Sequence, residues 1–251
     1  MRFLLTLFVI LAALPAFATC NGPSFLDRLT DDDRATLAAT IAATPFPDGM
    51  LFDAKRGADH LTVIGTIHIF DPRLSAIRAK VTADIAASDV LLVEASPDDA
   101  AKLERYLADN PEFMFLTDGP TLPDMMDEAA WETLAEALRA RDMPPFLAAK
   151  MQPWFLSITL AVAPCAMADL LAGKQGLDFM LMDDATAAGV PIVSLEHWSL
   201  VIDQMRAPSL DEQIATLELG LLPIEMQSEM FVAMFDSYLS GNIAEVWEAS
   251  R

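Results

Sequence analysis

Two short apolar runs with a helical pattern between them constrain the fold of this chain more than any other feature. Residues 61–67 (Leu-Thr-Val-Ile-Gly-Thr-Ile) are rich in β-branched side chains, and residues 90–94 (Val-Leu-Leu-Val-Glu) are apolar at successive positions. Between the runs, four apolar residues recur at the spacing of one helical face: Leu74, Ile77, Val81 and Ile85. Continuous apolar runs are typical of strands buried on both sides, as in parallel sheets. Residues 61–94 therefore predict one β-α-β unit.

A third strand and several helices are expected in the rest of the chain. Residues 191–196 (Pro-Ile-Val-Ser-Leu-Glu) form another short apolar run, and the pattern from Pro97 to about Met182 is mostly helical. Residues 46–56 contain Pro47-Asp48-Gly49, a turn signal, and are expected to form a loop. Together these patterns predict an α/β fold with a central, largely parallel sheet flanked by helices and a mostly helical middle insertion.

Helix boundaries are indicated by local side chains. Thr30 precedes three aspartates, as at a helix N-terminus, and Ser209 with Glu212 forms a capping box. Gly189 is expected to close a helix over residues 177–188. Further helices are expected over residues 127–141, 146–163 and 223–240.

The N-terminus has the three parts of a secretory signal peptide. Arg2 supplies the positive charge, residues 3–17 are apolar, and Ala16-Phe17-Ala18 fits a cleavage site, so residues 1–18 are predicted to be removed. A membrane anchor is the alternative, but the run is shorter than the roughly 20 residues of a spanning helix. A lipoprotein acylated at Cys20 is a second alternative, for which Phe17-Ala18-Thr19 is a poor motif. We expect an exported protein, periplasmic or secreted, without stable membrane insertion after cleavage.

Export changes the interpretation of the two cysteines. In an oxidising compartment an isolated pair most often forms a disulfide, which here would join Cys20 to Cys165. Two separate thiols remain an alternative. A catalytic Cys165 is disfavoured because no nucleophile motif surrounds it.

The charge balance excludes one class of partner. The chain has 16 Lys+Arg against 37 Asp+Glu, a formal net charge of -21. A phosphate backbone needs a positive footprint, so we expect no nucleic-acid partner. Acidity alone favours solubility and does not identify a substrate.

The predicted β-α-β unit brings chemical groups to one sheet edge. Parallel strands place their carboxyl ends together, where open α/β sheets bind ligands. His68 follows the first strand, while Glu94 and Glu196 end the second and third strands. If all three strands are parallel, these side chains face one crevice. An imidazole with carboxylates suits either a divalent metal or a general base with an orienting acid.

Each candidate also has a structural interpretation. His68 alone could be a hydrogen-bonded histidine at a strand end, and Glu196 could be a solvated strand end. Glu94 directly follows three apolar residues, where a carboxylate is costly unless it is paired or functional. Gly65 is expected to allow close approach to the backbone, and Thr66 adds a hydroxyl for substrate binding.

Two blocks of the sequence carry a recognisable pattern, whereas G-x-S-x-G, H-E-x-x-H, P-loop and G-x-G-x-x-G motifs are missing. The first block runs from Leu61 to His68 (L-T-V-I-G-T-I-H), continues through Asp71-Pro72-Arg73-Leu74 and ends at residues 91–94 (L-L-V-E). The second block is Gly176-Leu177-Asp178 followed by residues 189–196 (G-V-P-I-V-S-L-E). Together these blocks resemble the TraB/GumN family, which includes the Tiki proteases and is related to erythromycin-esterase-like hydrolases.

The resemblance implies a sheet flanked by helices and a metal-dependent hydrolase site. In Tiki members the activity is peptide hydrolysis supported by manganese or cobalt. Gly65 and His68 match the family's first G-x-x-H, Glu94 matches its strand-end glutamate, and Glu196 matches the acid of the second block. The implied metal ligands are His68 and Glu94, and the implied cofactor is a divalent metal such as manganese, cobalt or zinc.

One departure from the family pattern is that no second G-x-x-H follows the long helices. The interpretation is that residues 19–251 form a TraB/GumN-like domain lacking the family's C-terminal strand. The first functional hypothesis is therefore an exported metal-dependent hydrolase acting on a peptide or a small ester or amide. The alternatives are a binding or regulatory protein that keeps the fold without turnover, and a metal-free hydrolase with His68 as base.

Overall fold

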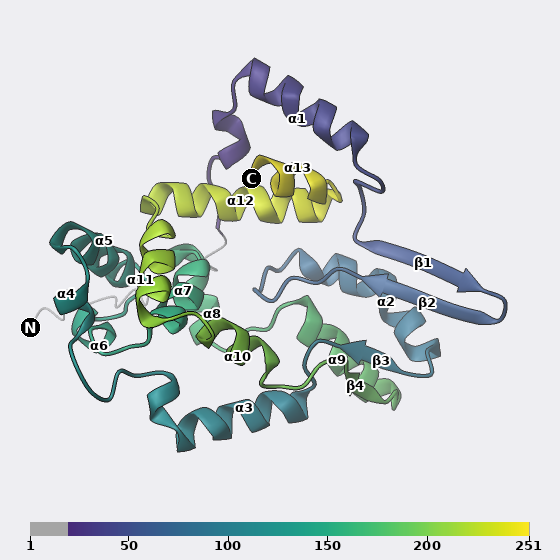
Figure 1. Ribbon diagram of the computed structural model, residues 1–251. Coiled ribbons are helices and arrows are strands. Elements are labelled where there is room, and N and C mark those ends of the chain that lie inside the picture. Colours follow the sequence, from purple (N-terminus) through teal and green to yellow (C-terminus); the bar gives the residue numbers. More distant parts are fainter. Residues whose placement is uncertain (1–19, 251) are drawn as a thin grey trace, which may run out of the picture.

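The computed structural model describes residues 20–250, and the predicted signal peptide therefore lies outside the described residues (Figure 1). The described chain is of the mixed α/β class and is mostly helical. Its four strands form an antiparallel pair, β1 (Leu51–Arg56) with β2 (Asp59–Ile64), and a parallel pair, β3 (Leu91–Val93) with β4 (Ile192–Ser194). The expected central sheet is thus replaced, within residues 20–250, by two sheets of two strands each.

The β1–β2 hairpin corrects two expectations. Residues 46–56 were expected to form a loop, but Leu51–Arg56 is a strand, joined to β2 by the two-residue turn at residues 57–58. Alternating apolar residues pair across the hairpin, Phe52 with Val63 and Ala54 with Leu61, so its register follows from a short local turn. The β-α-β prediction for residues 61–94 is therefore wrong in its pairing, because β2 bonds to β1 and not to β3.

The parallel pair is formed by two strands far apart in sequence. Leu92 lies opposite Val193, and Leu195 N–H donates to the carbonyl of Val93 at 2.8 Å. Leu91 and Ile192 pack against the main core, whereas Leu92 and Val193 on the other face are exposed. The expectation that these strands are buried on both sides is therefore wrong.

Helices cover the buried face of the parallel pair. On α2 (Leu74–Ala87) the four residues predicted to share one face are all buried. They pack with Leu177 and Leu181 of α9 (Leu177–Ala188), which ends at Gly189 in the left-handed region (φ 72°), as predicted. The long helix α12 (Ile224–Ser240) completes this core with Phe231 and Phe235.

A second core lies in the helical middle of the chain. It contains Leu134 and Leu138 of α5 (Glu128–Arg139) and Leu156 of α7 (Pro153–Ala161). The helix expected over residues 146–163 is divided into α6 (Pro145–Ala148) and α7, because Pro153 begins a new helix. Apart from the N-terminal helix and three short 3-10 helices, the other described helices are α3 (Pro97–Asp109), α4 (Leu122–Met125), α8 (Met167–Leu171), α10 (Leu200–Arg206), α11 (Leu210–Leu219) and α13 (Ile243–Ala249).

The N-terminal part of the described chain is fastened to the body. Helix α1 (Asp31–Ala43) begins at Thr30, whose hydroxyl accepts from Asp33 N–H, and α11 begins at the predicted Ser209–Glu212 capping box. The predicted disulfide is present: Cys20 and Cys165 are bonded, with Cα atoms 5.3 Å apart. This bond joins residues that are 145 positions apart in the sequence.

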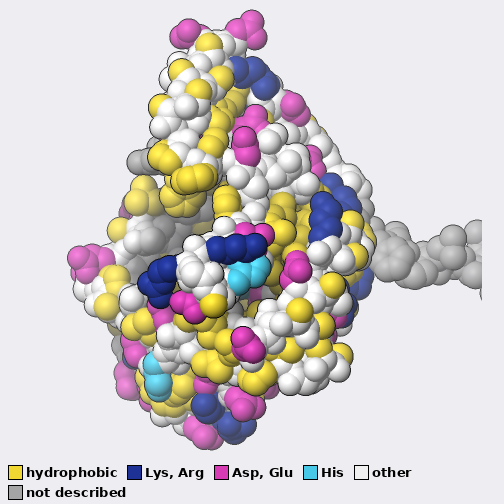
Figure 2. All heavy atoms as spheres, turned by 90° about the vertical axis from the view of Figure 1, so that its right-hand side faces the viewer, with side chains coloured by type: hydrophobic (Ala, Val, Ile, Leu, Met, Phe, Trp, Pro, Cys, Tyr) yellow, Lys and Arg dark blue, Asp and Glu magenta, His cyan; other side chains and the backbone are white. Residues whose placement is uncertain are grey.

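Figure 2 shows the hairpin side of the molecule, where apolar side chains reach the surface among charged ones. Exposed apolar residues on the strands include Leu61, Val63, Leu92 and Val193. Of the helices in residues 20–250, no single one has the length and apolarity of a membrane span; only the bent pair Pro153–Ala161 and Pro164–Leu171 meets those two criteria together.

Candidate active site

Three side chains meet where the segment after β2 reaches the start of α9. His68 Nδ1 lies 3.0 Å from Asp178 Oδ2, and His68 Nε2 lies 3.5 Å from Glu94 Oε2. The imidazole and Glu94 are largely exposed, whereas the Asp178 side chain is only 17% exposed. The juxtaposition predicted for His68 and Glu94 is therefore present, although β2 and β3 are not hydrogen-bonded neighbours.

The backbone around His68 is fixed by α9. Leu177 N–H donates to the carbonyl of Ile67 at 2.8 Å, and Gly176 lies directly against the His68 backbone. A Cβ atom on Gly176 would be 2.3 Å from the carbonyl carbon of His68, closer than real Cβ contacts allow. Only glycine at this position lets the His68 segment approach the helix so closely.

Helix α12 fixes the same segment from the other end. Tyr238 donates its hydroxyl to the carbonyl of Gly65 at 2.7 Å, and burial raises the pKa of Tyr238 to about 12, so the hydroxyl keeps its proton. Gly65 N–H donates to Met50 O at 2.8 Å. A Cβ on Gly65 would make only ordinary contacts with Met50, so close packing does not require glycine there. The predicted substrate-binding roles of Gly65 and Thr66 remain predictions.

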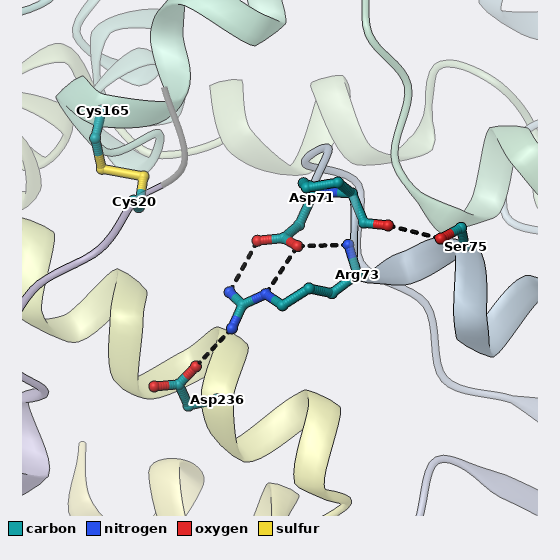
Figure 3. A network of polar contacts seen from close by, with 7 residues as sticks. Cys20, Asp71, Arg73, Ser75, Cys165 and Asp236 are labelled. Carbon is teal, nitrogen blue, oxygen red and sulfur yellow. Dashed lines mark hydrogen bonds and ion pairs between the residues drawn. A yellow bond between two sulfur atoms is a disulfide. The ribbon is translucent and has the colours of Figure 1, made fainter. Parts of the chain in front are cut away.

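A charged network anchors the chain as it leaves His68 (Figure 3). Arg73 donates through Nε and Nη2 to the two oxygens of Asp71 at 2.9 Å, and its Nη1 donates to Asp236 Oδ1 of α12 at 3.0 Å. Although burial alone raises the pKa of Asp71, the hydrogen bonds from Arg73 outweigh it and leave that pKa below its ordinary value. The Asp71-Pro72-Arg73 motif is therefore an anchor for the His68 segment.

Asp178 determines the state of the imidazole. The pKa of His68 is raised, chiefly by its hydrogen bond to Asp178; burial lowers it, and Glu94 adds a smaller raising effect. With Nδ1 bound to Asp178, Nε2 is the nitrogen that faces Glu94 and solvent. Asp178 Oδ1 is buried and has no hydrogen-bond partner in the described residues. Buried polar atoms usually have a hydrogen-bond partner, so this oxygen is available to a water molecule or a ligand.

The parallel pair carries the other predicted acid close by. Because Val93 lies opposite Ser194, Glu94 and Glu196 both follow the carboxyl ends of adjacent parallel strands. Glu196 is exposed, and within the described residues it forms no ion pair with His68. Ser194 donates its hydroxyl to Asp99, the buried residue in the first turn of α3, so α3 is fastened to this edge. Glu196 is therefore a neighbour of the site whose role stays a prediction.

The donor set fits a divalent metal only in part. Asp178 and Glu94 lie at opposite nitrogens of the imidazole, so both carboxylates cannot share one ion with His68. In residues 20–250 no group of three or more histidine, cysteine, aspartate or glutamate side chains is arranged to hold an ion. Catalytic zinc sites typically have three protein ligands, and His68 with Glu94 would supply two.

Asp178 is the site residue to which the sequence interpretation gave no role. It appeared only within the Gly176-Leu177-Asp178 block, and an acid in the first turn of a helix is common because it complements the helix dipole. The signal that was available is the glycine immediately before that turn, which marks a close backbone approach.

The fold and the site together define a class: an α/β protein with an exposed histidine held by a largely buried carboxylate near the carboxyl end of a parallel strand pair. The model of the TraB/PrgY/gumN family matches residues 50–251. Because this match covers most of the sequence, the chain belongs to the TraB/PrgY/gumN family. Comparison with curated proteins and with solved structures gave no significant match.

Proposed function

We propose that this protein is an exported hydrolase that cleaves an amide or ester bond, with His68 as the general base. The observation that carries the proposal is the 3.0 Å contact between His68 Nδ1 and the largely buried carboxylate of Asp178. A buried acid behind an exposed imidazole is the arrangement that orients a catalytic histidine. A binding protein without turnover would not need an imidazole that is oriented in this way.

The proposed chemistry uses the two sides of the imidazole differently. Asp178 accepts a hydrogen bond from Nδ1–H, which leaves the lone pair of Nε2 directed at solvent. Nε2 takes a proton from a water molecule as that water attacks the substrate carbonyl, and the imidazolium then returns the proton to the leaving amine or alcohol. Glu94, 3.5 Å from Nε2, stabilises the imidazolium and orients the water. In this proposal Glu196, which follows the neighbouring strand end, contacts the substrate.

Export is supported by two features. The signal-peptide pattern of residues 1–18 is one, and the Cys20–Cys165 disulfide is the other, because disulfides persist mainly in oxidising compartments. The proposal therefore places the enzyme in the periplasm or outside the cell, acting on a peptide or a small ester or amide.

A metal-dependent form of the reaction is the second candidate, favoured by the 3.5 Å separation of His68 Nε2 and Glu94 Oε2. Histidine ligands commonly donate their other ring nitrogen to a carboxylate, as His68 does to Asp178. If manganese, cobalt or zinc binds here, His68 and Glu94 would hold it, and the ion would polarise a carbonyl or activate water. Since the described residues supply only two ligands, no step above is assigned to an ion.

The decisive test compares two histidine variants of the exported protein. A panel of blocked peptides and small esters is assayed with the wild type, His68→Ala and His60→Ala, each checked for folding by circular dichroism. Removal of a general base typically costs about 10²–10⁴-fold in rate, so His68→Ala should lose that much while His60→Ala stays near wild type. Equal turnover by His68→Ala and the wild type would contradict the proposal.

Exhaustive chelation followed by metal analysis distinguishes the metal-dependent reaction from the metal-free general-base reaction. Turnover that persists without metal supports the general-base reaction. Turnover that disappears and returns with manganese, cobalt or zinc supports the metal-dependent form.

A further inference from the structure

We propose that the cavity between α3 and α9 is a substrate subsite that accepts a lysine or arginine side chain. This inference rests on the proposed hydrolase function and identifies its substrate class as peptides with a basic residue near the cleaved bond. The cavity has a volume of ≈ 300 Å³. That is at the lower end of about 300–1,000 Å³ for ligand pockets, a size suited to one side chain.

The walls of the cavity come from the segments that carry the candidate catalytic groups. Gln175 directly precedes Gly176, which touches the His68 backbone, and Phe179 directly follows Asp178. Pro97, three residues after Glu94, lines the other side. The cavity and the candidate catalytic groups therefore share the chain segments at the starts of α3 and α9, from which we infer that a side chain near the cleaved bond enters the cavity.

The lining combines an apolar body with acidic side chains. Ala100 and Ala101 of α3 face Phe179 and Met182 of α9 across the cavity, so its walls suit an aliphatic stem. Apolar walls alone would equally accept leucine or methionine. A preference for lysine or arginine over these apolar side chains must therefore come from charged groups in the lining.

Two carboxylates supply that distinction. Glu104 on α3 and Asp183 on α9 line the cavity, and no lysine, arginine or histidine does. The nearby cations have closer partners: Arg78 pairs with Asp184 and has Asp183 only as a weaker electrostatic neighbour, and Lys102 pairs with Asp99. Within residues 20–250 neither Glu104 nor Asp183 forms an ion pair. A cation at the end of an aliphatic stem therefore complements both parts of the lining.

The overall charge favours the same ligand. A formal net charge of -21 attracts cationic substrates and repels acidic ones at a distance. Lysine and arginine side chains are the natural groups that join a long apolar stem to a positive end.

The test measures binding without turnover. In the His68→Ala protein, NMR titration compares a blocked five-residue peptide containing one central lysine with the same peptide containing norleucine, which keeps the stem and lacks the charge. We expect the lysine peptide to bind about fivefold tighter, the effect of roughly 1 kcal/mol from partly exposed ion pairs. The preference should be lost in the Glu104→Gln/Asp183→Asn double variant and should weaken at high salt.

The control is Glu132→Gln/Glu136→Gln on α5, which removes the same charge from exposed positions away from the cavity. Equal binding of the two peptides, or equal loss of preference in the control, would overturn the subsite. Failure of the hydrolase proposal is seen separately, because a lysine preference without any wild-type turnover keeps the subsite and removes the reaction. Turnover that depends on His68, combined with equal binding of the lysine and norleucine peptides, would keep the reaction and remove the subsite.

Discussion

Two histidine–aspartate pairs in this molecule have the same separation and very different surroundings. His60 Nε2 lies 3.0 Å from Asp53 on the β1–β2 hairpin, and His68 Nδ1 lies 3.0 Å from Asp178 at the start of α9. On the hairpin the aspartate is 58% exposed, whereas Asp178 is 17% exposed and has one orphaned oxygen. The comparison teaches that burial of the carboxylate, and not contact distance, distinguishes a candidate active site from a surface pair.

The two pairs also differ in what holds them. Asp53 and His60 face each other across a hairpin closed by a two-residue turn, so their contact depends on local pairing. His68 and Asp178 are 110 positions apart and meet because Leu177 and Gly176 contact the backbone of residues 67–68. The first pair can therefore be lost without disturbing the core, while the second is part of how the core is assembled.

The largest expected difference between the pairs is in catalysis. Asp178→Asn should reduce kcat/KM by about hundredfold or more, because His68 loses the group that orients it, while Asp53→Asn should leave kcat/KM unchanged. Asp178 raises the pKa of His68, so any residual activity of Asp178→Asn should persist to lower pH than in the wild type. Both variants are assayed across pH with the same substrate. Equal losses in the two variants would contradict the distinction.

The second-largest expected difference is in the stability cost of substitutions in the main core and on the β1–β2 hairpin. Leu74 is fully buried in the core beneath the parallel strands, and Leu61 on the hairpin is 52% exposed. Leu74→Ala is expected to lower the free energy of unfolding by about 2–5 kcal/mol, and Leu61→Ala by about 1 kcal/mol or less. Urea denaturation of both variants, with the disulfide intact, checks this. A Leu61→Ala cost as large as that of Leu74→Ala would show that the hairpin's apolar face is covered in solution.

A smaller effect is expected at Gly176, where the start of α9 approaches the His68 backbone. Gly176→Ala would force the His68 backbone away from α9, so we expect a loss of about 1–3 kcal/mol in stability together with reduced turnover. Gly22→Ala is the matched control, because a Cβ there would meet nothing within 4 Å. Thermal unfolding and turnover are measured for both. Wild-type turnover in Gly176→Ala would show that the close approach is not needed to place His68.

Local features of the fold were predictable from sequence, and strand partners were not. The buried face of α2, the caps at Thr30 and Ser209 and the end of α9 at Gly189 each depend on residues within a few positions of one another. The pairing of β3 with β4 joins residues about a hundred positions apart. An apolar run predicts that a strand forms, but it does not identify the strand with which it pairs.

The candidate site shows the same division. His68 and Glu94 were expected together from an assumed parallel pairing of their strands. They do meet, but their strands lie in different sheets, and α9 packs against both β3 and the backbone next to His68. Asp178 received no role because an acid at a helix start has a sufficient local explanation. Its burial behind the imidazole depends on tertiary packing, which no local pattern encodes.

The smallest expected effect is the pH dependence of stability contributed by His68. Its pKa is raised in the folded state, so its stabilising contribution is complete below the unfolded value of about 6.5 and is lost as pH rises through the folded value. Because the ring is more than half exposed, screening limits this contribution to about 1 kcal/mol.

A double-mutant cycle with His68→Gln and Asp178→Asn, measured by urea unfolding between pH 5 and 9, isolates the coupling. We expect the coupling free energy to be largest at pH 5 and to decline toward pH 9, and the same cycle with His60→Gln and Asp53→Asn to give a smaller value, because solvent screens both members of that pair. A coupling between His68 and Asp178 that increases with pH would mean that the aspartate does not stabilise the protonated ring, and the proposed orientation of the imidazole would then be wrong.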